Sequence, residues 1–279
     1  MACNLSKPLI KSGAGASPRA NALLALDGSL GHVTEVLSGD YYQPLSTSSP
    51  HQIWSAAMVI SPILRGLFGL ETNALERKVV IAPHIPADWN SFTLRNVRIG
   101  ETTADLVYRR TPDEITLDID SGGTEQLDFS PALSPRAHVV SAELNGRRIP
   151  FQIKNNPTDL HTTVRASLLP GKATLRLKVQ NDFDISYSHS LPPLGASSRD
   201  LRIISGTWSA AHDALTLQIS GTAGSHYQLN LRNPEQIRSV DGGELKNAKL
   251  HVTFPSGSTP VYTSRGVVLH FVPAKHMKQ

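Results

Sequence analysis

The sequence has little of what disulfides, metal clusters or membrane spans require. It contains one cysteine, Cys3, which excludes an intramolecular disulfide and a cysteine-based zinc cluster. Its 11 histidines are scattered without the HxxxH spacing of a helical metal site, so we expect neither a metal nor another cofactor. No apolar run reaches the roughly 20 residues that span a bilayer, and the amino terminus has no apolar stretch of signal-peptide length. These features predict no membrane partner and leave the compartment open.

Charge of one sign is not in large excess. The chain has 27 Lys and Arg against 23 Asp and Glu, a formal charge of +4. Basic doublets at Arg109-Arg110 and Arg147-Arg148 lie beside strand or turn signals, without the basic stripe and interleaved aromatics that bind a phosphate backbone. Solvated strand faces explain these doublets, so no nucleic-acid partner is expected. At 279 residues the chain is long enough for one large or two ordinary domains, and we expect two.

The amino-terminal quarter predicts a few short helices. Residues 1–18 are rich in Ser, Gly, Ala and Lys, which predicts a disordered leader, and RANALLAL at 19–26 predicts a short helix. Ser49-Pro50 is typical of a helix start, with Ser as N-cap and Pro at the first helical position. Because Pro62 cannot sit undisturbed in one helix, we expect a helix over 50–60 and a restart that ends at Gly69.

The predicted helical turns carry a wide apolar face of the kind that helices bury. Its members are Ile53, Trp54, Ala57, Met58, Ile63, Leu64, Leu67 and Phe68.

From Lys78 onward the pattern changes to short β-type runs separated by Gly, Pro, Asn and Asp. Residues 73–183 contain KVVIAP, SFTLRNVRIG, ADLVYRR, EITLDID, HVVSAELNG, TVRASLL and ATLRLKVQ, which predict an antiparallel sandwich. Asn145-Gly146 predicts a hairpin turn, and residues 184–200 predict a linker. Residues 201–279 contain LRIISGTW, ALTLQISG, YQLNLR, LHVTF and GVVLHFV, which form either a second sandwich or the remaining strands of the first. The expected fold class is therefore mixed and mainly β, a short helical segment followed by an antiparallel β-sandwich region.

Acids, amides and aromatics crowd together just before the second predicted helix. Inverting cleavage of a glycosidic bond takes two carboxyl groups, one to protonate the leaving oxygen and one to activate water. Aromatic rings offer apolar faces to sugar C–H groups, and amides and imidazoles bond hydroxyls. The segment 31–54 holds this set of side chains: Glu35, Asp40, Tyr41, Tyr42, Gln43, His51, Gln52 and Trp54.

The pattern TEVLSGDYY followed by PHQIWSAAM resembles the C-terminal end of the six-hairpin α/α toroid glycosidases, especially the amylo-α-1,6-glucosidase (glycogen debranching enzyme) family. The resemblance covers about residues 20–70 and implies that Glu35 is the catalytic general base. Gly39-Asp40 matches the family's acidic loop and residues 52–55 match its Q-x-W-S segment. A weaker resemblance through VVIAPHIPADW is to the β-sandwich appended to several toroid glycosidases. The resemblance implies an α-glucoside oligo- or polysaccharide as partner, bound by Asp40, Tyr41, His51, Gln52 and Trp54.

The chain departs from this family in length. A toroid has twelve helices of about 11 residues each, far more than the residues before the β region provide. The family's general acid would lie in helices upstream of this sequence. We therefore expect a C-terminal fragment of an inverting α-glucoside hydrolase that is inactive alone and that self-associates through exposed helix faces.

The alternative is a non-catalytic β-sandwich module that binds carbohydrate or braces a toroid. Residue by residue, other interpretations stay open. Glu35 could be an exposed loop carboxylate, Asp40 a turn former and Trp54 a core residue. His84, Trp89 and Trp208 are interpreted as core or interdomain packing.

Overall fold

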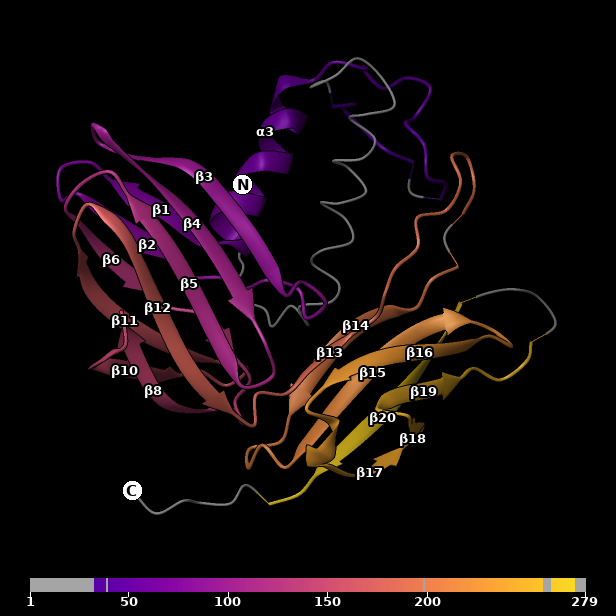
Figure 1. The fold of residues 1–279 in the computed structure, drawn as a ribbon. Helices are drawn as coiled ribbons and strands as arrows, with labels where there is room; N and C mark the ends of the chain where they lie inside the picture. The colour runs from indigo at the N-terminus through magenta and orange to yellow at the C-terminus, as the bar shows by residue number, and fades with distance from the viewer. Residues whose placement is uncertain (1–32, 39, 198, 258–261, 274–279) are drawn as a thin grey trace.

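The structure is a computed structural model that describes residues 33–38, 40–197, 199–257 and 262–273. The expected leader at 1–18 and the expected helix at 19–26 lie outside the described residues. The described part is mainly β, as the sequence predicts, with antiparallel sheets and one short helical segment (Figure 1).

The first β-sandwich is formed by two sheets that enclose one hydrophobic core. One sheet has the strand order β1 (Leu70–Asn73), β2 (Lys78–Ile81), β6 (Glu125–Phe129), β11 (Leu160–Leu168) and β10 (Phe151–Asn155), with β7 (Ala132–Leu133) paired to β11. The other has the order β3 (Ser91–Ile99), β4 (Thr102–Arg110), β5 (Glu114–Ser121), β12 (Gly171–Gln180), β8 (His138–Leu144) and β9 (Arg147–Ile149). All pairs are antiparallel except β2 with β6. Burial alternates along strands such as β3, because successive side chains point to opposite faces of a sheet.

The second β-sandwich has a hydrophobic core of its own. Its first sheet has the order β13 (Asp184–Ser186), β16 (His226–Arg232), β19 (Lys249–Thr253) and β18 (Glu244–Lys246). Its second sheet has the order β14 (Arg202–Trp208), β15 (Ala214–Thr222), β20 (Tyr262–Phe271) and β17 (Ile237–Asp241), and the 3-10 turn η2 (Pro234–Gln236) precedes β17. The strands from β1 to β12 and those from β13 to β20 thus lie in different sheets and contribute to separate hydrophobic clusters. Strand β13 lies inside the segment 184–200 for which the sequence predicts a linker, and Ile185 contributes to the second core.

The Asn145-Gly146 hairpin is confirmed. Both residues have positive φ, 50° and 77°, and the flanking Leu144 and Arg147 are paired between β8 and β9. Two left-handed residues match the twist of a two-residue hairpin, and Asn and Gly adopt that conformation at low cost. The interpretation of Trp89 and Trp208 as packing residues is also confirmed, because they pack against the first and the second core respectively.

The helical segment consists of α3 (Ile53–Ser61) followed without a gap by the π-helical turn η1 (Pro62–Leu67). Pro62 lies at the junction, and the segment ends at Gly69, which has a φ of 59°. The predicted break at Pro62 and the predicted end at Gly69 are therefore confirmed. The structure describes no helix long and apolar enough to cross a membrane.

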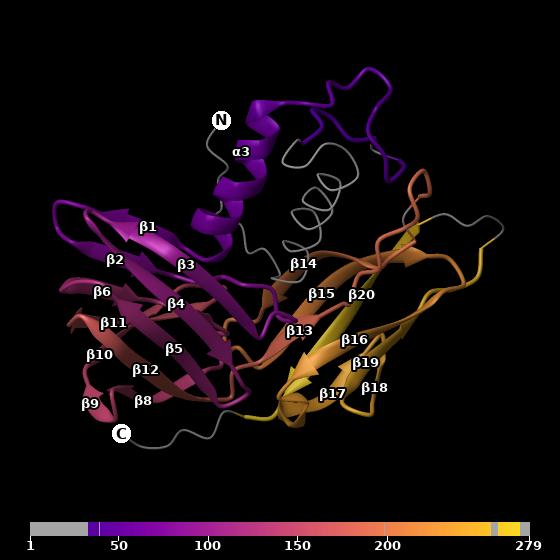
Figure 2. The ribbon, with the colours of Figure 1, turned by 45° about the horizontal axis from the view of Figure 1, so that its top comes forward.

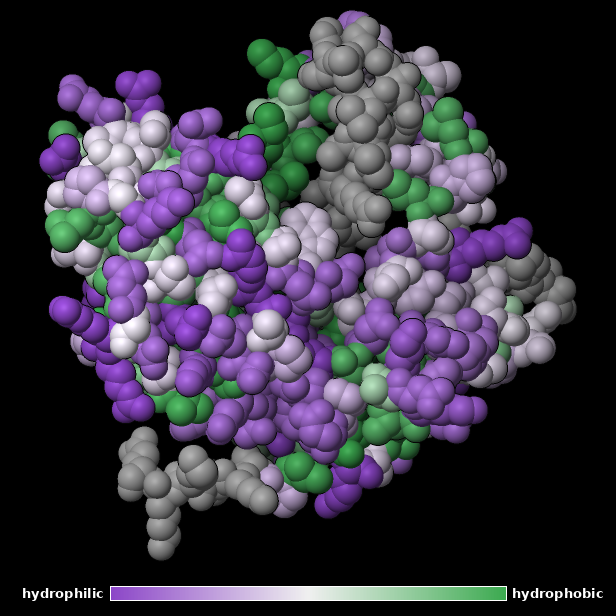
Figure 3. All heavy atoms as spheres, viewed as in Figure 1, coloured by the Kyte–Doolittle hydropathy of each residue, from purple (hydrophilic) through white to green (hydrophobic). Residues whose placement is uncertain are grey.

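The sequence predicts that these turns bury a wide apolar face. This prediction is wrong for α3 and confirmed only for the turn η1 that follows it. No residue of α3 is buried, and Ile53, Trp54 and Met58 are 84%, 55% and 71% exposed. Leu67 and Phe68 are buried in the first core, with Ile63 and Leu64 packed against it. The physical reason is the direction of the helix: α3 projects away from the first sandwich, and the turn η1 that follows it packs on the first core (Figure 2). Hydrophobic side chains accordingly gather at the surface over α3 (Figure 3).

Arg136 joins the two sandwiches. It lies between β7 and β8 of the first sandwich, and its guanidinium donates to three oxygens of the second. These are Oε1 of Gln236 at 3.1 Å, the carbonyl oxygen of His212 at 2.7 Å and that of Val272 at 2.9 Å. The same guanidinium carbon lies 4.6 Å from the centre of the Phe271 ring. Hydrogen bonds from all three nitrogens of one charged guanidinium hold the first sandwich to the second.

A buried ionic network lies at the same junction. Asp182 forms an ion pair with Arg110 and lies 3.3 Å from Nη1 of Arg232. Its other oxygen accepts the backbone N–H of Ser134 at 2.9 Å, and Arg232 also donates to the carbonyl of Ala87 at 3.0 Å. Burial disfavours the charge of Arg110, but Asp182 outweighs that cost and raises the pKa of Arg110 above its ordinary value. The network therefore keeps its charges paired inside the junction.

Candidate functional site

The residues that the sequence singles out lie on one irregular hairpin that leads into α3. The backbone N–H of Glu35 donates to Ser49 O at 2.9 Å, that of Leu45 donates to Val36 O at 3.1 Å, and Leu37 is bridged to Pro44. The segment 33–38 thus runs antiparallel to 43–52. This pairing brings Glu35 to the base of the hairpin, beside the start of α3.

Glu35 is held there by serines on the opposite side of the hairpin. The backbone N–H of Ser49 lies 3.4 Å from Glu35 Oε2, and the Ser55 hydroxyl lies 3.4 Å from the Glu35 carbonyl oxygen. The Ser48 hydroxyl accepts the next backbone N–H, that of Val36, at 2.9 Å. The Glu35 side chain is half-buried. The Ser49 contact orients the carboxylate, and the other two hold the backbone at residues 35 and 36.

The start of α3 differs from the expectation. The sequence predicts Ser49 as N-cap and Pro50 as the first helical residue, whereas the helix begins at Ile53 with Gln52 as N-cap. The reason is the hairpin: Ser49 O and the Gln52 N–H are bonded to Glu35 and to Val33, which keeps 49–52 extended. Gln52 is therefore placed at the helix start beside Glu35, and Trp54 lies on the first helical turn with its ring about half in solvent.

Asp40 and Tyr41 lie at the opposite end of the hairpin. Their backbone N–H groups donate to the Ser38 hydroxyl at 3.2 and 3.1 Å, which closes the tip, and both side chains are exposed. The neighbouring Tyr42 exchanges backbone bonds with the 190s loop of the second sandwich, to Ala196 O at 2.9 Å and from Gly195 N–H at 3.0 Å. Glu35 thus contacts Ser49 and Ser55 near the start of α3, whereas Asp40 and Tyr41 lie at the tip of the hairpin.

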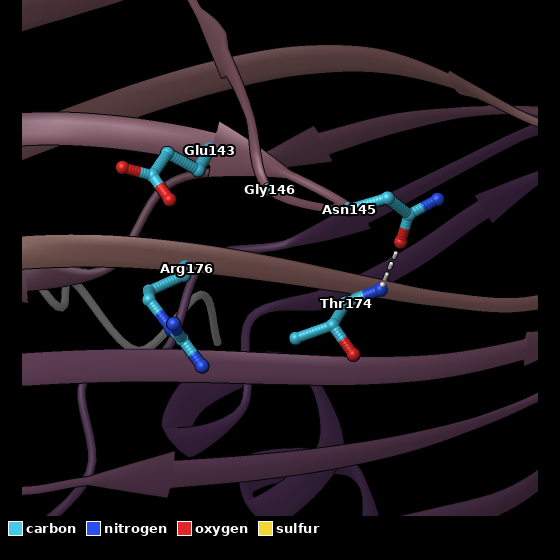
Figure 4. A pocket seen from close by; sticks show the side chains of 5 residues that line it. All are labelled: Glu143, Asn145, Gly146, Thr174 and Arg176. Atoms are coloured by element: carbon cyan, nitrogen blue, oxygen red, sulfur yellow. Dashed lines mark hydrogen bonds between the residues drawn. The ribbon is translucent and has the colours of Figure 1, made fainter.

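A shallow depression of about 270 Å³ lies on the outer face of the first sandwich, at the β8–β9 hairpin (Figure 4). Its lining residues are Glu143, Asn145, Gly146, Thr174 and Arg176. The Asn145 side chain accepts the backbone N–H of Thr174 at 2.8 Å, so this group serves the turn. The lining holds one carboxylate and one cation, which is not the pair of carboxyl groups that glycoside cleavage requires.

A second cluster of chemically active side chains was not found from the sequence. His84, Asp159 and His161 lie together at one end of the first sandwich, although the sequence interpretation expected no metal site and assigned His84 to packing. Asp159 and His161 are close in sequence, since Asp159 immediately precedes β11 and His161 is the second residue of that strand. His84 is 77 positions from His161, and no local pattern predicts that contact.

Fold and site together define a mainly β protein of two antiparallel sandwiches with a carboxylate-bearing hairpin and a projecting helix. The sequence matches no known protein family and no curated protein. Among solved structures, an α-L-rhamnosidase from Dictyoglumus thermophilum aligns with 52% of this chain and 15% of its own, at 12% identity and a TM-score of 0.33. A β-L-arabinofuranosidase from Geobacillus stearothermophilus aligns with 80% of this chain and 34% of its own, at 7% identity and a TM-score of 0.29. Both neighbours are glycoside hydrolases, and the chain spans about a third or less of their length.

Proposed function

We propose that this chain is the base-bearing C-terminal part of an inverting glycoside hydrolase that acts on α-glucosides. In this proposal Glu35 is the general base that activates water, and Gln52 and Trp54 contact the sugar. Asp40, Tyr41 and His51 contribute to substrate binding at the rim. The chain by itself is inactive, because the carboxyl group that protonates the leaving oxygen belongs to helices outside it.

The observation that carries the proposal is the position of Glu35. A general base must hold its carboxylate toward a water molecule, and the Ser49 N–H at 3.4 Å from Oε2 orients that carboxylate at the start of α3. Ser55, the last residue of the Q-x-W-S segment, lies 3.4 Å from the Glu35 carbonyl oxygen, which supports the proposal. Among the described residues, Glu35 has a contact with the Ser49 N–H and no ion pair that its role as base would have to break.

The exposed apolar residues of α3 support the proposal that helices outside this chain complete the site. In an α/α toroid each helix packs against two neighbours, and the apolar face at Ile53, Met58 and Ile60 is of the kind that such packing covers. These side chains are exposed in the described structure. Additional helices that bury this face would also bring a second carboxyl group opposite Glu35.

Titration of the chain with maltotriose and isomaltotriose, followed by amide and indole NMR signals, tests the binding half of the proposal. We expect weak binding that perturbs the signals of Glu35, Gln52 and Trp54, is lost in Trp54→Ala, and releases no glucose. Trp208→Phe, in the second core, is the matched control and should keep the perturbations. Perturbations confined to residues 73–279 would instead favour the non-catalytic carbohydrate-binding module, and no perturbation at saturating sugar would contradict both.

A further inference from the structure

The three side chains of His84, Asp159 and His161 converge from two separate connections of the first sandwich. His84 follows β2 in the connection to β3, Asp159 precedes β11, and His161 lies on β11 itself. Their ligand atoms all lie within 4.8 Å of one another. His161 is on the outer face of its sheet, since its neighbours Leu160 and Thr162 are buried.

Hydrogen bonds to backbone carbonyls fix the protonation of both imidazole rings. Nδ1 of His84 lies 3.0 Å from Ala82 O, and Nδ1 of His161 lies 3.2 Å from Ser130 O. A carbonyl oxygen only accepts, so each Nδ1 must carry the ring's proton. In a neutral imidazole the other nitrogen, Nε2, then presents a lone pair.

These two lone pairs face each other. Nε2 of His84 and Nε2 of His161 are 3.0 Å apart, and Asp159 Oδ2 lies 3.8 Å from the first and 3.3 Å from the second. Three electron-rich atoms at such distances repel one another unless a proton or a metal ion lies between them. A metal ion at the centre would satisfy all three atoms at once.

We propose that His84, Asp159 and His161 form a zinc-binding site. Two imidazole nitrogens and one carboxylate oxygen are a common protein ligand set for a catalytic-type zinc ion, with water in the fourth position. Ligand atoms 2.0–2.1 Å from zinc at tetrahedral angles lie about 3.3 Å apart, and the observed separations of 3.0, 3.3 and 3.8 Å bracket that value. The His84 side chain is partly exposed, which leaves room for the fourth ligand.

The surroundings have the contacts that metal ligands usually have. Each histidine donates its other ring N–H to a backbone carbonyl, and Asn156 donates to the second oxygen of Asp159 at 2.8 Å. The bound ion would tie the β2–β3 connection to the β10–β11 turn, and this inference does not depend on the proposed hydrolase function.

Calorimetric titration of the chelator-treated full chain with zinc chloride tests the proposal. We expect one ion per chain, a thermal midpoint that rises with zinc concentration, and a cobalt complex with the intense visible absorption of tetrahedral coordination. His84→Ala and His161→Ala should each weaken binding by more than about 100-fold, and Asn156→Ala should weaken it by roughly 10-fold, because it alters only the orientation of Asp159. Asp159→Asn removes the negative charge of this side chain but keeps its size and shape, so it tests the contribution of the carboxylate alone.

His226→Ala is the matched control. His226 and His251 form an exposed histidine pair on β16 and β19 with a 3.1 Å contact. If surface histidines bound zinc adventitiously, His226→Ala would weaken that binding. The proposal predicts unchanged zinc binding in this variant. Circular dichroism of every variant checks that it is folded. Absence of zinc binding by the wild-type chain, or unchanged binding in folded Asp159→Asn and His84→Ala, would overturn the proposal.

Discussion

At the scale of single residues, most polar side chains in this protein are paired, and the exceptions are informative. Thr162 on β11 is fully buried, and its hydroxyl has no hydrogen-bond partner among the described residues. The adjacent Thr163 faces the other side of the sheet, where its hydroxyl bonds Ser130 Oγ at 3.0 Å. Two neighbouring threonines on one strand thus have opposite environments.

We predict opposite effects of the same substitution at these two positions. Thr162→Val should raise the free energy of unfolding by about 1 kcal/mol, because it replaces an unpaired buried hydroxyl with a methyl group of similar size. Thr163→Val should lower it by about 1 kcal/mol through loss of one hydrogen bond. Urea denaturation of both variants measures the difference. If Thr162→Val is less stable than the wild-type protein, the Thr162 hydroxyl forms a hydrogen bond in solution.

At the scale of elements, the sequence predicted those parts in which local pattern and final environment agree. Strands such as β4 alternate between polar and apolar residues and were predicted correctly. The edge strands β1 (LETN) and β10 (FQIKN) are short and have no buried residue, and they were missed. Their position depends on pairing with a neighbouring strand and not on their own composition. The apolar face of α3 predicted a helix, but composition cannot tell which of its sides meets a partner.

The candidate site was likewise predictable only where a local sequence pattern marks it. Glu35 and the residues 52–55 are joined by a sequence signature, and Ser55 of that segment contacts the Glu35 carbonyl oxygen. The distance of Asp40 from Glu35 follows from the closed tip at Ser38, which the sequence did not reveal. The histidine cluster depends on contact between residues 77 positions apart, which only the folded chain supplies.

Gly69 sets the direction in which α3 leaves the first sandwich. Its φ is 59°, and a Cβ there would lie 2.2 Å from the Ala82 carbonyl oxygen. Gly69→Ala therefore carries both a left-handed backbone cost and a clash. Gly146→Ala is the control, since Gly146 has a φ of 77° and open space around its Cβ position.

We predict that Gly146→Ala lowers the free energy of unfolding by about 1–2 kcal/mol and that Gly69→Ala lowers it by a further 1–3 kcal/mol, roughly the cost of overpacking. Chemical denaturation of the two variants side by side measures the difference. Equal losses would mean that the β1–β2 region yields easily around the new methyl group.

The exposed face of α3 predicts self-association. Ile53 and Met58 expose most of their side chains on one short helix, and clustered apolar surface favours contact between copies. Sedimentation velocity should show larger species at higher protein concentration, and the double variant Ile53→Lys, Met58→Glu should shift the population to monomer. Leu75→Lys is the control, because Leu75 is 97% exposed but lies in the β1–β2 turn. A wild-type chain that stays monomeric at all concentrations would contradict this prediction.

At the scale of the whole molecule, the two sandwiches are coupled by buried polar contacts and not by a continuous apolar core. Each sandwich has its own hydrophobic cluster, and Arg136 and the Asp182 network cross the junction. The hairpin before α3 adds a third connection, because Tyr42 bonds the 190s loop of the second sandwich. The candidate base is therefore held in a frame to which both sandwiches contribute.

We predict that Arg136 makes the two sandwiches unfold together. Arg136→Leu removes three hydrogen bonds and leaves two backbone carbonyls and the Gln236 side chain buried at the junction, so we expect a loss of about 3 kcal/mol or more. Scanning calorimetry should show one transition for the wild-type chain and two for this variant. Arg148→Leu, at an exposed position of β9, should change the midpoint little. A single unshifted transition in Arg136→Leu would show that other contacts hold the junction.

The most direct test of the account is the turnover of Glu35→Gln in the protein extended by the coding sequence upstream of residue 1, with a branched α-1,6-glucoside as substrate. The account predicts that the wild-type extended enzyme releases the β-anomer of glucose, as inversion requires. It also predicts that Glu35→Gln loses roughly 10²–10⁴-fold in turnover with little change in KM, because water activation is removed. Glu71→Gln, at an exposed position of β1, should keep full activity. Near-normal turnover of folded Glu35→Gln would contradict the assignment of Glu35 as the general base.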